Sequence, residues 1–279
     1  MTADISIFDG TSPLRIDKPL RLIELFAGYG SQALALKYLG IPFEHHRISE
    51  WAIKSIYAYK ELHATDDNCD YSAPFTDKEI RKWFYGGKIS SNYNDPIADD
   101  KIDKMPIDEL RQLFNAMQAT NNKGSVVGVK AADLKIIDTD KYTYLMTYSF
   151  PCQDLSKSGK QQGMSRDSNT RRGRVGHGTS QTIDTAGGEL QGGVEEPKAT
   201  PHFRIRKLTE RECFRLMGMA DEDSAKLIAT QNKTSLYHLA GDSIVTTVLM
   251  AIFGEMFGMD WESKVREHVE RLCSNESNG

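Results

Sequence analysis

The sequence predicts an α/β fold in which a parallel sheet is flanked by helices. Strand-like and helix-like segments alternate twice within about forty residues near the N-terminus, which is typical of this class. A glycine pair, Gly28 and Gly30, follows the first of these strands, and a Pro151-Cys152 pair ends a later one. The chain has 279 residues, so it is long enough to bury a sizeable core.

The composition is that of an ordinary globular chain with a slightly acidic balance. Apolar residues make up 39% and charged residues 27%, and the formal net charge is −4. This excludes a globally basic, coat-like nucleic-acid binder but does not exclude local basic surfaces. No run of about 18 uncharged apolar residues occurs, and the first thirty residues lack a basic start followed by an apolar stretch. We therefore expect neither a membrane-spanning nor a secreted protein.

The cysteine pattern indicates neither a zinc site nor a disulfide framework. Four cysteines lie far apart and form no C-x-x-C pair, so we expect no metal and a reducing, cytosolic setting. They are Cys69, Cys152, Cys213 and Cys273.

Two strand–helix pairs open the fold after a loosely structured leading segment, residues 1–19. The first strand is a short apolar run that leads into the glycine pair, and Gly40 ends the helix that follows. The second strand ends at Glu50-Trp51. We expect strands at 21–27 and 43–49 and helices at 33–38 and 52–62.

The next part of the chain predicts an insertion followed by a third strand of the main sheet. Residues 64–105 are polar and rich in turn signals, and we interpret them as an insertion. Helical spacing predicts a helix over 107–119, and Val126-Val127 indicates a strand. The apolar run 144–150 predicts a strand that Pro151 ends.

Residues 165–203 change in character, because seven glycines occur between 173 and 193 alone. This is too many for a stable helix or a central strand, so we expect a flexible connector or a loosely held pair of strands. A helix over 209–217 follows, with Thr209 as N-cap, Glu212 in the capping-box position and Gly218 as the stop. Two more helices, at about 243–257 and 261–273, end the chain.

The glycine loop and the end of the second strand predict a site for an adenosine cofactor. Gly28-x-Gly30 lets a ligand approach the backbone and leaves N–H groups at a helix start, where an anionic group is favoured. Glu50 suits the two hydroxyls of an adenosine ribose, and Phe26 and Trp51 offer flat faces to an adenine ring.

Other interpretations of this loop stay open. With Ala33 the loop satisfies G-x-G-x-x-A, and Glu50 lies twenty residues beyond Gly30, so a nicotinamide dinucleotide site competes. A tight strand–helix turn without a ligand is a second alternative, and ordinary core packing would explain Phe26 and Trp51.

Cys152 is a candidate nucleophile, because it follows a predicted strand and Pro151 and so lies at the carboxyl edge of the sheet. A lone buried cysteine is usually inert. Between 154 and 174, however, six basic residues outnumber two acidic ones, an excess that favours a thiolate and attracts phosphates. The basic residues are Lys157, Lys160, Arg166, Arg171, Arg172 and Arg174.

Taken together, these motifs resemble the DNA (cytosine-5)-methyltransferase family, particularly its prophage and restriction-modification types. The resemblance covers roughly 20–62, 126–164 and 203–257, in family order, and a dinucleotide dehydrogenase would not explain the later motifs. The motifs are Phe26-Ala27-Gly28-Tyr29-Gly30, Glu50-Trp51, Ala132-Asp133-Leu134, Pro151-Cys152-Gln153-Asp154-Leu155-Ser156, the segment from Arg204 to Gly218, and Gly241-Asp242-Ser243-Ile244-Val245.

The resemblance implies a doubly wound, Rossmann-like methyltransferase fold with S-adenosylmethionine as cofactor and double-stranded DNA as substrate. It implies that Cys152 attacks C6 of an extruded cytosine so that C5 accepts a methyl group. It also implies the cytoplasm of a bacterial or phage-infected cell. The implied cofactor residues are Phe26, Ala27, Gly28, Gly30, Glu50, Trp51, Asp133, Pro151, Asp242 and Ser243.

The implied DNA-contacting residues are mainly basic. They are Ser156, Lys157, Lys160, Arg172, Arg174, Arg204 and Arg206. For Arg206, as for Arg211 and Arg215, an ion pair on a helix surface is an equal alternative.

Two family segments, Glu-Asn-Val and Gln-x-Arg-x-Arg, do not occur in the sequence. Only 51 positions separate Cys152 from Arg204, too few for the missing strands and a recognition domain. We therefore expect a fold truncated in its second half. Residues 1–164 would carry the cofactor site and nucleophile, 165–203 would replace the recognition domain, and 204–279 would complete the catalytic domain.

This truncation bears on activity. A natural deletion remnant, an engineered short version and one half of a split enzyme with a second chain for target recognition all fit the sequence. We expect the chain alone to be impaired in methylation, and an inactive remnant that binds cofactor or DNA is the alternative.

Overall fold

The computed structural model describes residues 13–148, 193–197 and 203–274. The chain divides into two compact units. Unit 1 comprises residues 1–149 and 244–279, and unit 2 comprises residues 150–243. The boundaries expected at 164/165 and 203/204 stay predictions, and each unit is described here by itself.

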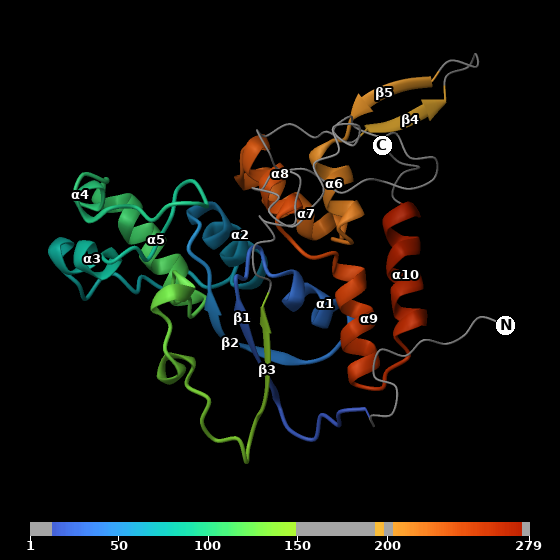
Figure 1. The fold of residues 1–279 in the computed structure, drawn as a ribbon, viewed down its shortest axis with the longest axis horizontal. Coiled ribbons are helices and arrows are strands. Elements are labelled where there is room, and N and C mark those ends of the chain that lie inside the picture. The colour runs from blue at the N-terminus through green and yellow to red at the C-terminus, as the bar shows by residue number, and fades with distance from the viewer. Residues whose placement is uncertain (1–12, 149–192, 198–202, 275–279) are drawn as a thin grey trace, which may run out of the picture. The chain divides into compact units, whose positions relative to one another are not determined.

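Unit 1 is built on a parallel three-stranded sheet in the order β2-β1-β3 (Figure 1). The strands are β1 (Leu20–Leu25), β2 (Phe43–Ser49) and β3 (Thr143–Tyr148). Leu25 is paired with Ser49 on one side and with Tyr148 on the other, so the three carboxyl ends lie at one edge of the sheet. This confirms the predicted parallel α/β sheet, and it brings the loops after all three strands to the same edge.

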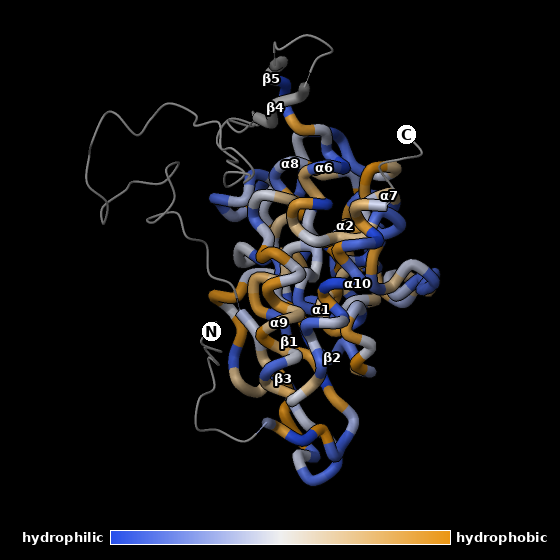
Figure 2. Tube along the Cα trace, turned by 90° about the vertical axis from the view of Figure 1, so that its right-hand side faces the viewer, coloured by the Kyte–Doolittle hydropathy of each residue, from blue (hydrophilic) through white to orange (hydrophobic). Residues whose placement is uncertain are grey.

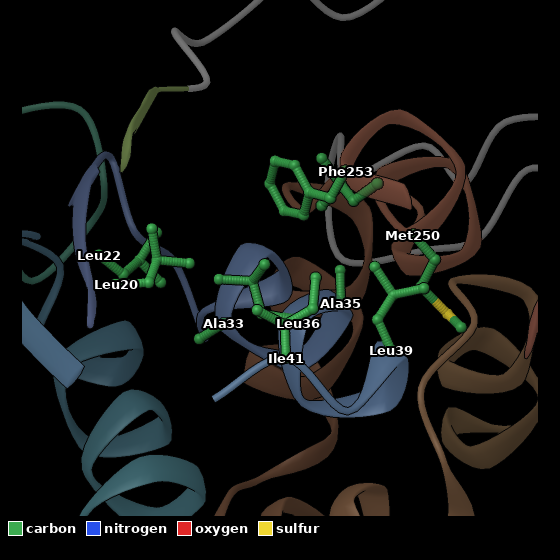
Figure 3. Close-up of a cluster of buried hydrophobic side chains, with 10 residues drawn as sticks. Leu20, Leu22, Ala33, Ala35, Leu36, Leu39, Ile41, Met250 and Phe253 are labelled. Atoms are coloured by element: carbon green, nitrogen blue, oxygen red, sulfur yellow. The ribbon is translucent and has the colours of Figure 1, made fainter. Parts of the chain in front are cut away.

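One hydrophobic core joins β1 to helices from opposite ends of the chain. The helices are α1 (Ser31–Leu39), α9 (Thr246–Met256) and α10 (Trp261–Ser274), which confirm the predicted first and last helices. Figure 3 shows α1 side chains directed at the strand and at α9. The buried members are Leu20, Leu22, Ala33, Ala35, Leu36, Leu39, Ile41, Leu249, Met250 and Phe253. The trace in Figure 2 shows hydrophobic residues along α9 and the central strands.

A second core forms in the segment that we interpreted as a turn-rich insertion, and that interpretation missed two helices. After α2 (Ile53–His63), the chain forms α3 (Asp77–Phe84), α4 (Asp99–Ile102) and α5 (Ile107–Ala119). Their apolar faces pack together around Ile80, Phe84, Leu113 and Met117, all fully buried. Residues 64–105 are therefore part of a small helical layer with its own core.

The strand expected at Val126-Val127 is wrong. These residues form η1 (Val126–Gly128), a short 3₁₀ turn, and Val127 is 92% exposed. A second 3₁₀ turn, η2 (Ala131–Leu134), follows. Two adjacent β-branched residues favour a strand only where a pleated surface is available to cover them, and here none is.

Unit 2 contains a hairpin and three helices in its described part. The hairpin pairs β4 (Gly193–Pro197) with β5 (Phe203–Lys207), and the helices are α6 (Glu210–Leu216), α7 (Asp221–Thr230) and α8 (Lys233–Gly241). Thr209 caps α6 in a capping box with Glu212, as predicted. Sequence patterning missed α7 and α8. Most of the glycine-rich segment, with its predicted connector, lies outside the described residues.

One stretch, Lys233–Met256, has the length and mean hydropathy, 1.5, to cross a membrane. It consists of two helices, α8 and α9, separated by residues 242–245. Composition of this kind is weak evidence for a span, because buried core helices share it.

Candidate functional site

The glycine loop after β1 has three residues in the left-handed region of backbone conformation. Phe26, Gly28 and Gly30 have φ values of 56°, 55° and 85°. The Gly30 N–H donates to the Ala27 carbonyl at 2.7 Å, and the Ala27 N–H donates to the Ser49 carbonyl at 3.2 Å. The loop is therefore a tight turn tied to the end of β2, and Gly30 directly precedes α1.

The two glycines meet different surroundings. A Cβ on Gly30 would lie 2.4 Å from Nε2 of His63 and 2.8 Å from the Tyr59 ring, so that face is filled by α2. A Cβ on Gly28 would meet nothing within 4 Å. Gly30 is thus required for packing inside the protein, whereas Gly28 presents open backbone that a ligand can approach.

Glu50 is held in place by two backbone N–H groups, one for each carboxylate oxygen. Oε2 accepts from Gly28 N and Oε1 from Ala52 N, both at 2.8 Å. The side chain is only 8% exposed. The predicted acidic partner of the glycine loop therefore contacts that loop directly. These two hydrogen bonds orient the carboxylate at the edge of the glycine loop, and its role in binding a ribose stays a prediction.

Asn122 is a residue of this site that sequence reasoning missed. Its Oδ1 accepts from Glu50 N at 3.1 Å and from Gly124 N at 2.8 Å, and Asn122 forms a parallel bridge with Ile48. Residues 122–124 thus extend the sheet beyond β2 and fix the backbone of Glu50. The only local signal was a short polar Asn-x-Gly turn after α5.

Phe26 and Trp51 flank the site at the ends of β1 and β2, and both are half-buried. The Trp51 carbonyl accepts from Ser90 N at 2.8 Å, so the helical layer anchors this position. Because both aromatic side chains are partly exposed, their faces are accessible to the ring of a ligand. Their role in adenine binding stays a prediction.

Asp133 and the tenth-motif residues, Asp242 and Ser243, are each described by their own local contacts. Asp133 lies in η2, where its carboxylate accepts from Lys130 N. The carbonyls of the next two residues, Leu134 and Lys135, contact His46 in the middle of β2. Asp242 and Ser243 belong to unit 2, directly after α8, where Ser243 Oγ donates to the Ala240 carbonyl. Their assignment to the cofactor stays a prediction.

The nucleophile loop and most predicted DNA contacts lie outside the described residues. This holds for Pro151, Cys152, Ser156, Lys157, Lys160, Arg172, Arg174 and the side chain of Arg204. Arg206 is described, and its guanidinium binds both carboxylate oxygens of Glu212 at 2.7 and 2.5 Å. This ion pair lowers the pKa of Glu212 to about 2. Arg215 forms a similar pair with Asp221. Both arginines therefore form ion pairs, Arg206 from β5 and Arg215 from α6, and a DNA contact by Arg206 stays a prediction.

Within the described ranges no three His, Cys, Asp or Glu side chains are placed to hold a metal ion. A parallel sheet with a glycine loop and a carboxylate at its carboxyl edge is the arrangement of Rossmann-like domains that bind nucleotide cofactors.

Comparison with protein families identifies the chain more closely. A model of the C-5 cytosine-specific DNA methylases matches residues 95–175 and 171–258, more than half of the chain. The chain belongs to the C-5 cytosine-specific DNA methylase family. The matched ranges include Cys152, Asp133, Asp242 and Ser243. Gly28 and Glu50 precede both ranges, so their assignment rests on the geometry above.

Curated relatives carry methyltransferase names. The chain is 33% identical to the orphan methyltransferase M.SssI of Spiroplasma monobiae over 161 residues, which cover 56% of this chain and 40% of the relative. It is 33% identical to the type II methyltransferase M2.ScrFI of Lactococcus lactis subsp. cremoris over 153 residues, 54% of this chain and 40% of the relative. The orphan methyltransferase M.SPRI of Bacillus phage SPR is 47% identical over 57 residues, 20% of this chain and 13% of the relative. The chain thus spans about two fifths of the length of the first two relatives.

Proposed function

We propose that this chain is an S-adenosylmethionine-dependent enzyme that methylates C5 of cytosine in DNA through an adduct with Cys152. The observation that carries the proposal is the Gly28–Glu50 hydrogen bond at the carboxyl edge of the sheet, in a chain of the C-5 cytosine-specific methylase family. The methyltransferase names of the bacterial and phage relatives support the same activity and a cytoplasmic location.

The residues present fit an adenosine cofactor. The open side of Gly28 leaves room for a ligand against the backbone, and the fixed carboxylate of Glu50 offers acceptors for ribose hydroxyls. Phe26 and Trp51 would contact the adenine, and Asp133, Asp242 and Ser243 are the further proposed contacts. When bound, S-adenosylmethionine supplies an electrophilic methyl group, so the reaction needs no metal.

The proposed chemistry begins with the Cys152 thiolate adding to C6 of an extruded cytosine. The new carbon–sulfur bond would place negative charge on the ring, which a proton at N3 neutralises. C5 would then take the methyl group, with S-adenosylhomocysteine as the leaving group, and N3 would give up its proton again. Loss of the C5 proton and departure of the thiolate then release the product. The basic residues around Cys152, together with Arg204, would contact DNA phosphates.

A second candidate is a methylase remnant that binds cofactor or DNA without turnover. The observation that favours it is coverage: the matches reach only about two fifths of the two longest-matched relatives, and no Glu-Asn-Val segment occurs in the sequence. General acid help of the kind that N3 needs typically contributes about 10² to 10⁴ in rate. If the chain is instead the enzyme of the main proposal, the same observations imply slow methylation by the chain alone, and a second chain for target recognition is one of the arrangements that fit.

Trapping with a 5-fluorocytosine duplex tests the proposal, because a fluorine at C5 blocks release of the adduct. We expect a slow adduct with the purified chain and S-adenosylmethionine, and none with Cys152→Ala. Absence of any adduct with the unmodified chain would favour the remnant, whereas rapid Cys152-dependent trapping would show that no essential catalytic segment is missing.

A further inference from the structure

A buried chain of polar side chains lies behind the glycine loop and is not used by the proposed chemistry. Glu24, the last but one residue of β1, is fully buried, and its Oε2 accepts from the Tyr59 hydroxyl of α2 at 2.5 Å. Its Oε1 accepts from Ala33 N in the first turn of α1 at 3.3 Å. The same Tyr59 oxygen lies 2.8 Å from Nδ1 of His45 in β2. One carboxyl therefore links β1, α1, α2 and, through Tyr59, β2.

The second contact from α2 reaches the loop itself. Nε2 of His63 lies 2.9 Å from the Tyr29 carbonyl, so this nitrogen carries the proton and donates. The rings of Tyr59 and His63 lie with centroids 4.5 Å apart, and together they fill the space where a Gly30 side chain would be. The opposite side of the loop is fixed by Glu50 through Gly28 N. The glycine loop therefore contacts α2 through residues 29 and 30 and contacts Glu50 through residue 28.

The hydrogen bonds among Glu24, Tyr59 and His45 determine which of these side chains carries each proton. Because Tyr59 donates to Glu24, His45 must donate its Nδ1 proton to the Tyr59 oxygen. Burial raises the pKa of Glu24 to about 7, although the bonds from Tyr59 and Ala33 act against this, and burial lowers the pKa of His45 to about 4. The groups of the described structure that face Glu24 are Tyr59, the Ala33 peptide and, beyond Tyr59, His45 and His63.

We propose that Tyr59 and His63 are positioning residues of the cofactor site: anchored on Glu24 and on the Tyr29 carbonyl, they hold the glycine loop in the geometry that accepts the cofactor. This inference deepens the proposed function and rests on it. Neither side chain needs to contact the cofactor, because both act through the backbone of residues 28–30. The role predicts that their loss loosens the loop in the free protein and weakens binding.

Tyr59→Phe is the sharpest variant, because it keeps the ring that packs against Gly30 and removes only the hydroxyl. We expect the dissociation constant of S-adenosylhomocysteine, measured by calorimetry, to rise about three- to tenfold, the usual range for one buried hydrogen bond. Tyr57→Phe is the matched control, since Tyr57 lies on the same helix but packs in the second core. It should leave the affinity unchanged at similar thermal stability.

His63 allows a rescue experiment. His63→Ala removes the donor to the Tyr29 carbonyl and should weaken binding, whereas His63→Gln retains an amide N–H and should restore most of the affinity. Equal affinities for the two variants would contradict a role through this hydrogen bond.

Hydrogen exchange of the cofactor-free chain separates this inference from the proposed function. Amides of residues 28–30 should exchange about three- to tenfold faster in Tyr59→Phe than in Tyr57→Phe. Unchanged exchange there would overturn the inference whether or not the chain binds cofactor. Failure of the unmodified chain to bind either S-adenosylmethionine or S-adenosylhomocysteine would instead overturn the proposed function.

Discussion

At the scale of single residues, we expect Glu50 to contribute strongly to the proposed cofactor affinity. Its carboxylate is oriented by Gly28 and Ala52 before any ligand arrives, so binding loses little entropy in fixing it. Glu50→Ala should weaken S-adenosylmethionine binding about ten- to a hundredfold, the range expected for charge-assisted hydrogen bonds of roughly 1.5–3 kcal/mol.

Calorimetry on a matched variant checks this prediction. Glu44 lies at the other end of β2, is 55% exposed and pairs with Arg21, so Glu44→Ala should leave binding unchanged. Unchanged affinity in Glu50→Ala would remove Glu50 from the site.

Gly30 provides a second residue-scale prediction, this time for stability. Gly30→Ala would place a methyl group against His63 at a φ of 85°, so both backbone strain and overpacking oppose it. We expect a loss of about 2–4 kcal/mol in the free energy of unfolding. Gly40 has a φ of 76° but open space around it, so Gly40→Ala should cost only about 1–2 kcal/mol. Equal losses in urea unfolding would contradict the close contact with α2.

At the scale of elements, the buried chain between β1, β2 and α2 makes stability depend on pH. The pKa of Glu24 is raised to about 7 from 4.5, so the folded state holds a proton that the unfolded state releases between these values. Its contribution therefore weakens as pH rises from about 4.5 to 7, by up to about 3 kcal/mol. His45 acts in the opposite sense, because its lowered pKa makes the folded state lose stability as pH falls from 6.5 towards 4.

The difference in the free energy of unfolding between the unmodified chain and Glu24→Gln isolates the contribution of the Glu24 carboxyl. Relative to Glu24→Gln, the unmodified chain should lose stability from pH 4.5 to 7 and run parallel to it above pH 8, as measured by denaturant unfolding. Parallel curves over the whole range would mean that Glu24 titrates normally.

Elements set by local signals were predictable from the sequence. The cap at Thr209, the stop at Gly40 and the helix over residues 107–119 depend on a few neighbouring residues, and all three are confirmed. The strand at Val126-Val127 was wrong because strand formation depends on a partner surface that the sequence does not display. The Gly28–Glu50 pairing was predictable because parallel strands end together, whereas Asn122 joins the site through a long-range bridge.

At the scale of the whole molecule, two facts determine what we expect of cofactor binding and methyl transfer. The chain belongs to the methylase family, and it matches only part of the length of its relatives. The part of the proposed cofactor site that includes Gly28 and Glu50 lies on the loops after β1 and β2, so we expect cofactor binding not to depend on target-recognition elements. Methyl transfer needs more, including an acid for N3 and contacts that extrude the base, which alone costs a few kcal/mol. We expect methylation of mixed-sequence DNA to be slow with this chain alone, as measured by transfer of labelled methyl groups. Turnover as fast as that of an active DNA (cytosine-5)-methyltransferase measured alongside it would contradict this expectation.

Calorimetric titration of the purified chain with S-adenosylmethionine and, separately, with NAD tests whether the glycine loop and Glu50 form a methyltransferase cofactor site. We expect saturable binding of S-adenosylmethionine at one site, weakened in Glu50→Ala and kept in Glu44→Ala, with no binding of NAD. Binding of NAD in place of S-adenosylmethionine, or no binding of S-adenosylmethionine by a folded chain, would contradict it.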